Sequence, residues 1–459
     1  MVSSKSHINN KSISGVRLST VVPGKAREET KDQELTNMDL ATKLHYIKGV
    51  YFFKSEAVEG LTIDDFKVPM FPLLDQFLAA AGRIRVPEPT EEGAGDGAGG
   101  GRPFIKCNDA GVRILEAHCE KTIEEWLGLV MEEKLDDGDH DDGDGDDIYD
   151  VHDGLCWKQV LGPDLGFSPL VFLQFTWFKC GGMSLGLSWA HILGNPLLAS
   201  TFINTWAQIM TGHVPQKPLH VPTPRIAQSP RSNFPKKQTP LSLKVQLPSG
   251  NNLWSASNNS KMRSHSFRVT PKQLDHLLSI SYPRNQTPIL SHFEILSAVI
   301  WKSLSGIREN SNPNLITICN FESSNPNSMV ISSILADFSV AEADVSKLGF
   351  LISKKGKIEN SEIEELIEKN IGKEDYILYG ANLTFVNLEE LQIYGVEIEG
   401  HKPVFTTYSI EGVGENGVVL LLPAGTKEEK WKGQIANVVL PEDQLVILRN
   451  ELATRWGIV

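Results

Sequence analysis

The sequence lacks a cysteine framework, an excess of basic charge and any long apolar run. Five of its 459 residues are cysteine and none forms a Cys-x-x-Cys pair, so neither a disulfide scaffold nor a cysteine-based zinc site is supported. No stretch reaches the roughly 18 apolar residues that a membrane span needs, and the polar start at residues 1–7 is unlike a secretory signal. We therefore expect folding in the cytosol, with reduced cysteines in or near the cores.

The formal net charge of −13 excludes the basic surface that nucleic-acid binding requires. Eleven carboxylates interleaved with glycine lie between residues 132 and 150, and residues 91–101 are rich in glycine. Both segments are predicted to be solvated, disordered insertions. Residues 137–148 faintly resemble a calcium loop, but Asp142 stands where that loop needs glycine and Ile148 where it needs glutamate. No metal site is predicted.

A lone histidine, His191, lies where a predicted strand meets a predicted helix. Apolar runs at 170–178 and 183–189 indicate two buried strands. Asn195 is a good N-cap and Pro196 a good first helical residue, and apolar residues continue beyond them at helical spacing. A histidine held in this setting suits a general base for acyl transfer, and the alternative interpretation is a core histidine with satisfied hydrogen bonds.

Residues 182–186 also match the G-x-S-x-G pattern of a hydrolase nucleophile elbow. An elbow requires the strand to end at the serine. Here the apolar pattern continues through Ser184 to Trp189. We therefore predict that Ser184 is a small strand residue and not a nucleophile.

The order of the motifs predicts two domains. Residues 1–212 form the first, with the insertions near 91–101 and 132–150, and residues 262–459 form the second. Between them, residues 213–261, with seven closely spaced prolines from Pro215 to Pro240, are predicted to be a crossover linker. In the second domain the patterns predict strands at 267–269 and 417–423, and helices at 271–278, 292–304 and 441–453.

His191, with Asn195 four residues later and a helix beyond, resembles the HxxxD block of the BAHD acyltransferases. The resemblance covers nearly the whole chain, and its other landmarks are residues 35–39, 81–83, 107–112, Phe293-Glu294, Ala298 and Trp301. It implies an α/β fold of two similar domains with mixed sheets and helices, like chloramphenicol acetyltransferase, joined by a long crossover linker. It also implies no cofactor, with acyl-CoA as a possible ligand.

Two elements depart from the family pattern near the motif histidine. The family usually has aspartate at the position of Asn195, where it is structural and held by a basic partner; asparagine keeps the capping geometry and loses the charge. Asn320-Phe321-Glu322 stands where many members have an Asp-x-Arg element. Replacement of the aspartate alone would leave His191 usable as a base.

The second family signature, DFGWG, is replaced at all five positions. The matching residues are Glu397, Ile398, Glu399, Gly400 and His401. In catalytic members this loop shapes the domain junction and the channel by which acyl-CoA enters, so the resemblance implies a remodelled junction. His401 could serve as a surrogate donor to an oxyanion, but its neighbours favour an exposed turn.

Further blocks resemble a narrower group, the eceriferum-type or Glossy-like proteins of plant cuticular wax synthesis. These blocks are residues 161–164, 178–182, 187–194 and 379–388. The resemblance implies an accessory factor that works with the ketoacyl-CoA synthase of the fatty acid elongase to extend very-long-chain acyl-CoAs, and in which the histidine motif is dispensable. It implies a monomer that reaches the cytosolic face of the endoplasmic reticulum through this partner, with the cytosol and nucleus as further locations.

Two alternatives remain open at this point. One is an active acyl-CoA-dependent O- or N-acyltransferase with His191 as general base. The other is a scaffold that binds the synthase and no lipid. The sequence assigns no substrate-binding residues, no particular synthase and no product chain length.

Overall fold

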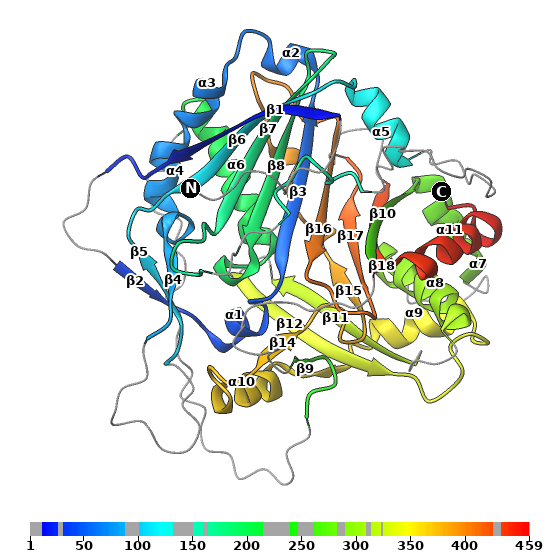
Figure 1. Ribbon diagram of the computed structural model, residues 1–459. Helices are drawn as coiled ribbons and strands as arrows, with labels where there is room; N and C mark the ends of the chain where they lie inside the picture. Colours follow the sequence, from blue (N-terminus) through cyan, green and yellow to red (C-terminus); the bar gives the residue numbers. More distant parts are fainter. Residues whose placement is uncertain are drawn as a thin grey trace, which may run out of the picture.

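Two mixed β-sheets lie side by side in the computed structural model, and helices cover their outer faces (Figure 1). The structure describes residues 12–25, 31–87, 101–131, 150–158, 161, 164–213, 239–246, 261–281, 290–308, 314–322, 325–425 and 433–458. Most of the predicted linker and both predicted insertions, including the segment that resembles a calcium loop, lie outside these residues.

The first sheet has six strands in the order β1-β6-β7-β8-β3-β16. Their bounds are Ile13–Val21 (β1), Val112–Cys119 (β6), Val171–Phe178 (β7), Met183–Ala190 (β8), Tyr46–Phe53 (β3) and Phe405–Glu411 (β16). Only β6 and β7 are parallel neighbours; the other pairs are antiparallel. The strands β7 and β8 confirm the two predicted buried runs, and β8 continues through Ser184 as predicted.

The second sheet has seven strands in the order β10-β18-β17-β15-β11-β12-β13. Their bounds are Met262–Val269 (β10), Gln434–Pro441 (β18), Val418–Pro423 (β17), Leu383–Asn387 (β15), Leu315–Glu322 (β11), Asn325–Leu335 (β12) and Lys357–Ile358 (β13). Parallel pairing occurs between β11 and β15 and between β15 and β17. Mixed sheets in both parts of the chain confirm the predicted fold class.

Helices and smaller sheets complete the two layers. The helices are α1 (Asn37–Ala41), α2 (Ser55–Val58), α3 (Ile63–Lys67), α4 (Met70–Gln76), α5 (Ile123–Met131), α6 (Pro196–Met210), α7 (Pro271–Ser281), α8 (His292–Ile307), α9 (Val345–Ser353), α10 (Asn360–Lys369) and α11 (Glu442–Trp456). Small sheets join β2 (Lys31–Glu34), β5 (Phe104–Cys107) and β4 (Arg83–Arg85), and β14 (Asp375–Ile377) with β9 (Lys244–Gln246). The predicted helices of the C-terminal part correspond to α7, α8 and α11.

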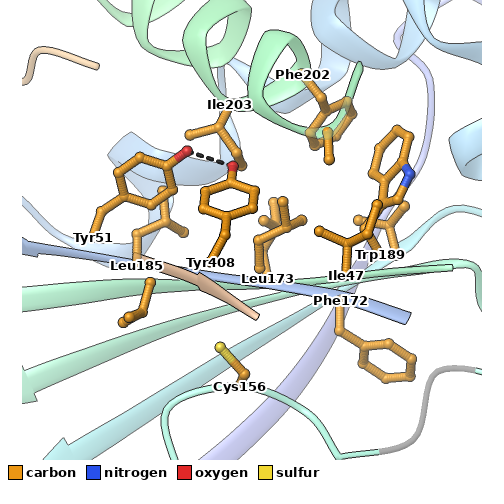
Figure 2. Close-up of a cluster of buried hydrophobic side chains, with 14 of the residues drawn as sticks. Ile47, Tyr51, Cys156, Phe172, Leu173, Leu185, Trp189, Phe202, Ile203 and Tyr408 are labelled. Carbon is orange, nitrogen blue, oxygen red and sulfur yellow. Dashed lines mark hydrogen bonds between the residues drawn. The ribbon is translucent and has the colours of Figure 1, made fainter. Parts of the chain in front are cut away.

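The first sheet is completed by a strand from late in the chain. β16 pairs with β3, so that Tyr408 lies opposite Gly49. The tyrosine ring occupies the space where a side chain at Gly49 would lie. Its hydroxyl forms a 2.6 Å hydrogen bond with the hydroxyl of Tyr51 beneath α6 (Figure 2). The larger hydrophobic cluster accordingly contains residues from both parts of the chain.

The two faces of the first sheet have different covers. Phe202 and Ile203 of α6 pack on the face that carries Tyr51 (Figure 2). On the opposite face, Trp157 stacks on Phe172 at a centroid distance of 4.9 Å. Residues 150–158 therefore cover this opposite face, and we call them the second cover. They can approach the sheet closely because Gly186 has no side chain.

Replacing Gly186 with alanine should destabilise the protein. The new Cβ would lie 1.8 Å from the carbonyl oxygen of Leu155, so the backbone of the second cover would have to move. We expect a loss of about 1–3 kcal/mol in the free energy of unfolding, typical of overpacking, measured by denaturant titration. Gly306→Ala is the matched control, because a Cβ there meets open space in α8 and alanine favours a helix by up to about 1 kcal/mol. Equal effects of the two substitutions would contradict this packing.

Candidate functional site

The chain places His191 directly after β8, at the first residue of a short 3-10 turn, His191–Leu193. Gly194 follows with φ of 146°, and a Cβ there would lie 2.5 Å from the side chain of Leu198. Asn195 then caps α6. The predicted junction of strand and helix is therefore confirmed, and His191 is buried with 3% of its surface exposed.

The imidazole of His191 contacts a tyrosine from far along the chain. Its Nε2 lies 3.0 Å from the hydroxyl oxygen of Tyr379, which follows β14. The same hydroxyl lies 3.5 Å from the sulfur of Met329 on β12. Both rings are buried. The nitrogen that a general base would direct at an acceptor is therefore already hydrogen-bonded to a protein side chain.

A second histidine, His45, holds the two partners in place. Its carbonyl oxygen accepts a hydrogen bond from the backbone N–H of His191 at 3.1 Å. Its ring Nε2 accepts from the backbone N–H of Leu378 at 3.1 Å and of Tyr379 at 3.4 Å. An Nε2 that accepts hydrogen bonds carries no proton, so the ring proton of neutral His45 is on Nδ1. His45, His191 and Tyr379 thus form one buried hydrogen-bonded unit, which we call the His-Tyr clasp.

Burial keeps the clasp uncharged. Loss of solvation lowers the pKa of His191 to about 4. Loss of solvation, with the neighbouring His191 as a second cause, lowers the pKa of His45 to about 3. Burial raises the pKa of Tyr379 well above its ordinary value, so its hydroxyl keeps its proton. Near neutral pH a phenol therefore faces a neutral imidazole.

Asn195 stabilises the start of α6. Its side-chain oxygen accepts from the backbone N–H groups of Leu197 at 3.0 Å and Leu198 at 3.2 Å. Its amide nitrogen is buried and has no hydrogen-bond partner among the described residues. Asparagine therefore performs the capping part of the family aspartate's role, without a carboxylate that could bind a cation.

The loop that replaces DFGWG lies far from the clasp. Ile398 is buried, whereas His401 is exposed on a turn closed by hydrogen bonds between these two residues. Glu399 and Gly400 adopt positive φ of 47° and 78° in that turn. The loop leads into β16, which pairs with the Phe52 end of β3, whereas His45 precedes the other end. One strand length, roughly 20 Å, separates them. The structure does not bring His401 to His191.

Sequence reasoning did not identify the partners of His191. Tyr379 was part of a motif block without a role, and nothing singled out His45. Sequence reasoning also missed a buried ion pair. Nζ of Lys43 lies 2.5 Å from Oδ1 of Asp375, and the pair connects the segment before β3 to β14. The third departure from the family, Asn320-Phe321-Glu322, lies at the end of β11. Asn195 caps α6 as predicted, whereas the remodelled junction predicted from the replaced loop stays a prediction.

Other expectations concern metals, membranes and thiols. Within the described residues no cluster of histidine, cysteine, aspartate or glutamate could hold a metal ion, and no helix is long and apolar enough to span a bilayer. All five cysteines are free. Four are buried, but Cys180 is exposed, because it lies in the turn between β7 and β8. The expectation that every cysteine lies in or near a core was wrong for Cys180.

Comparisons with known proteins find close relatives. The model of the Transferase family matches residues 12–319. The chain is 40% identical to Protein ECERIFERUM 2 of Arabidopsis thaliana over 96% of this chain and 98% of that protein. It is 37% identical to Protein ECERIFERUM 26-like of Arabidopsis thaliana, over 96% of this chain and 95% of that protein. The crystal structure of vinorine synthase is similar in fold, with a TM-score of 0.63 and 15% identity over 96% of this chain and 98% of that one.

We expect acid to destabilise the protein between about pH 6.5 and pH 4. Unfolded histidines bind protons near pH 6.5, whereas His45, His191 and His265 are buried and have lowered pKa values of about 3, 4 and 4. In this range the unfolded state binds more protons than the folded state. The free energy of unfolding therefore falls as the pH is lowered, by up to roughly 1.4 kcal/mol per pH unit for each histidine. Denaturant titrations across this range measure the slope.

His191→Gln should make the free energy of unfolding depend less steeply on pH, by up to roughly 1.4 kcal/mol per pH unit, because the unfolded chain then binds one proton fewer. His118→Gln is the control, since His118 is exposed and keeps its water when the chain folds. An unchanged slope in His191→Gln would show that His191 is solvated in the folded protein and that the clasp is not closed.

Proposed function

Because the chain belongs to the Transferase family, the family of the BAHD acyltransferases, we propose that it is an accessory factor of the fatty acid elongase. In this role it works with a ketoacyl-CoA synthase and extends very-long-chain acyl-CoAs for cuticular wax. The relatives that it matches over almost their whole length are named ECERIFERUM proteins. The single structural observation that supports a role without catalysis is the hydrogen bond between Tyr379 and His191.

The His-Tyr clasp is a poor arrangement for acyl transfer. A general base must lie within hydrogen-bond reach of the proton that it removes. Nε2 of His191 is within reach of the Tyr379 hydroxyl instead, and that hydroxyl keeps its proton. An acceptor alcohol or amine would have to displace a fully buried tyrosine before it could meet the base. The geometry therefore favours a protein that has retained the fold and lost the reaction.

A long acyl chain is a suitable ligand for such a protein. Each methylene that leaves water contributes roughly 0.8 kcal/mol, so even partial shelter of a growing tail favours longer intermediates on the synthase. We propose long-chain acyl-CoA as the ligand and the synthase as the partner. The proposed place of action is the cytosolic face of the endoplasmic reticulum.

The second candidate is an acyl-CoA-dependent O- or N-acyltransferase. It is favoured by one observation, the position of His191 after a buried strand and before a capped helix, as in the family motif. The two candidates predict opposite effects of substitutions in the clasp. They can therefore be separated with the same set of variants.

The test is acyl chain-length profiling in yeast that expresses a plant ketoacyl-CoA synthase, with and without this protein. For an accessory factor, His191→Ala should extend the acyl chains as the unsubstituted protein does, because no proton transfer is involved. Tyr379→Phe should also leave the profile unchanged. It removes the hydroxyl, keeps the ring and frees Nε2 of His191. Thermal unfolding checks that each variant is folded.

Loss of the longest acyl chains in a folded His191→Ala variant would contradict the proposal. Ester or amide products that appear with the unsubstituted protein, increase with Tyr379→Phe and vanish with His191→Ala would establish the acyltransferase. No effect of the unsubstituted protein with any synthase tested would exclude the accessory role.

A further inference from the structure

Three arginines lie together at one end of the first sheet without a carboxylate partner. Arg83 and Arg85 are on β4, and Arg113 is on β6. Arg83 is buried and donates only to the carbonyl oxygens of Gly82, Ala110 and Gly111. The positive charges of Arg113 and Arg85 add to burial in lowering its pKa to about 10. The three charges are therefore close enough to repel one another.

The two outer arginines are partly exposed and are held by neutral groups. Arg85 donates to the carbonyl oxygens of Ile84 and Gly166, and Arg113 donates to the hydroxyl of Thr20. Within the residues that the structure describes, neither has an ion-pair partner. In a chain of net charge −13 this is a local cluster of positive charge.

An exposed apolar side chain, Leu18, lies near Arg113 on the same face of the first sheet. Thr20 pairs with Arg113 and Leu18 with Leu115, and residues that pair or alternate along a strand share a face. Leu18 is 59% exposed and lies on β1, the edge strand of the first sheet. The neighbouring strand continues this face, since Arg113 pairs with Phe172 of β7.

The turn before β7 presents a phenylalanine to solvent. Phe167 is 80% exposed. Its turn is rigid: the Asp164 carboxylate accepts from the backbone N–H of Gly166, and the Asp164 carbonyl accepts from Phe167 and Ser168. The hydrogen bond from Arg85 to Gly166 attaches this turn to β4. Val86, next to Arg85, is also exposed.

We propose that this face, formed by Leu18, Arg85, Arg113 and Phe167, docks directly on an anionic lipid surface. The guanidinium groups match phosphate oxygens in charge and geometry. Phe167, held outward by its turn, enters the boundary between headgroups and acyl chains. The proposal goes beyond the accessory role and does not depend on it, because it gives the chain a membrane contact of its own.

The charge pattern favours lipid over an acidic protein as the occupant. The exposed apolar side chains of the face, Leu18 and Phe167, lie on an edge strand and in a turn, which suits shallow insertion of single side chains. The acidic excess of the whole chain would repel an anionic membrane, so binding needs this local basic face. An acidic protein partner remains an outcome that the experiment can detect.

The test is flotation of the full chain with phosphatidylcholine vesicles, with or without phosphatidylserine as the minor lipid. We expect binding to the anionic vesicles that weakens as salt is added. Arg113→Gln should weaken it about fivefold, the value of roughly one basic residue near an anionic surface. Phe167→Ser should weaken it about tenfold.

Two substitutions outside the face are matched controls. Arg17→Gln removes an arginine of β1 whose side chain is 83% exposed. Arg17 pairs with Glu116 and lies on the other face of the sheet from Leu18 and Arg113. Phe71→Ser removes a partly exposed phenylalanine on α4. Equal effects of test and control substitutions, or no flotation of the unsubstituted protein, would overturn the proposal. A third result would also overturn the proposal and assign the face to a protein partner. In that case this protein does not bind anionic vesicles alone, and a synthase in phosphatidylcholine vesicles binds the Arg113 and Phe167 variants more weakly than the unsubstituted protein.

Discussion

The hydrogen bond between Tyr379 and His191 determines what the centre of this protein can do. Loss of solvation keeps both groups neutral, and burial of a polar atom costs less free energy when that atom is hydrogen-bonded. Tyr379 provides one for Nε2 of His191, while His45 provides acceptors for the backbone groups around both. The arrangement closes the position from which a base would act, so stability of the core and accessibility of the histidine oppose each other.

The two parts of the chain must be packed together for this bond to exist. His191 ends a strand of the first sheet, whereas Tyr379 follows β14 and contacts Met329 of the second sheet. β16, the buried Lys43–Asp375 ion pair and the Tyr51–Tyr408 hydrogen bond fix the same relative position. A buried ion pair is costly to break because one charge is left unpaired. The junction is therefore a stiff part of the molecule and not an open channel wall.

Local patterns predicted the elements around His191 and failed for its partners, for a physical reason. Strand periodicity, the Asn195 cap and Pro196 act within a few residues, so the strand, the turn and α6 could be predicted from sequence. His191 and Tyr379 are 188 positions apart. A single sequence contains no periodicity that reports a contact at such a distance. The position of β16 in the first sheet escaped prediction for the same reason.

The substitutions in the two family motifs have different structural consequences, and this difference bears on function. Asn195 retains the oxygen that caps α6, which the fold needs, and gives up only the charge. The replaced loop at 397–401 keeps one buried residue, Ile398, and otherwise forms an exposed turn. The capping oxygen at position 195 is therefore kept, whereas the family motif is replaced at all five positions of the loop. This is the pattern that the proposed accessory role predicts.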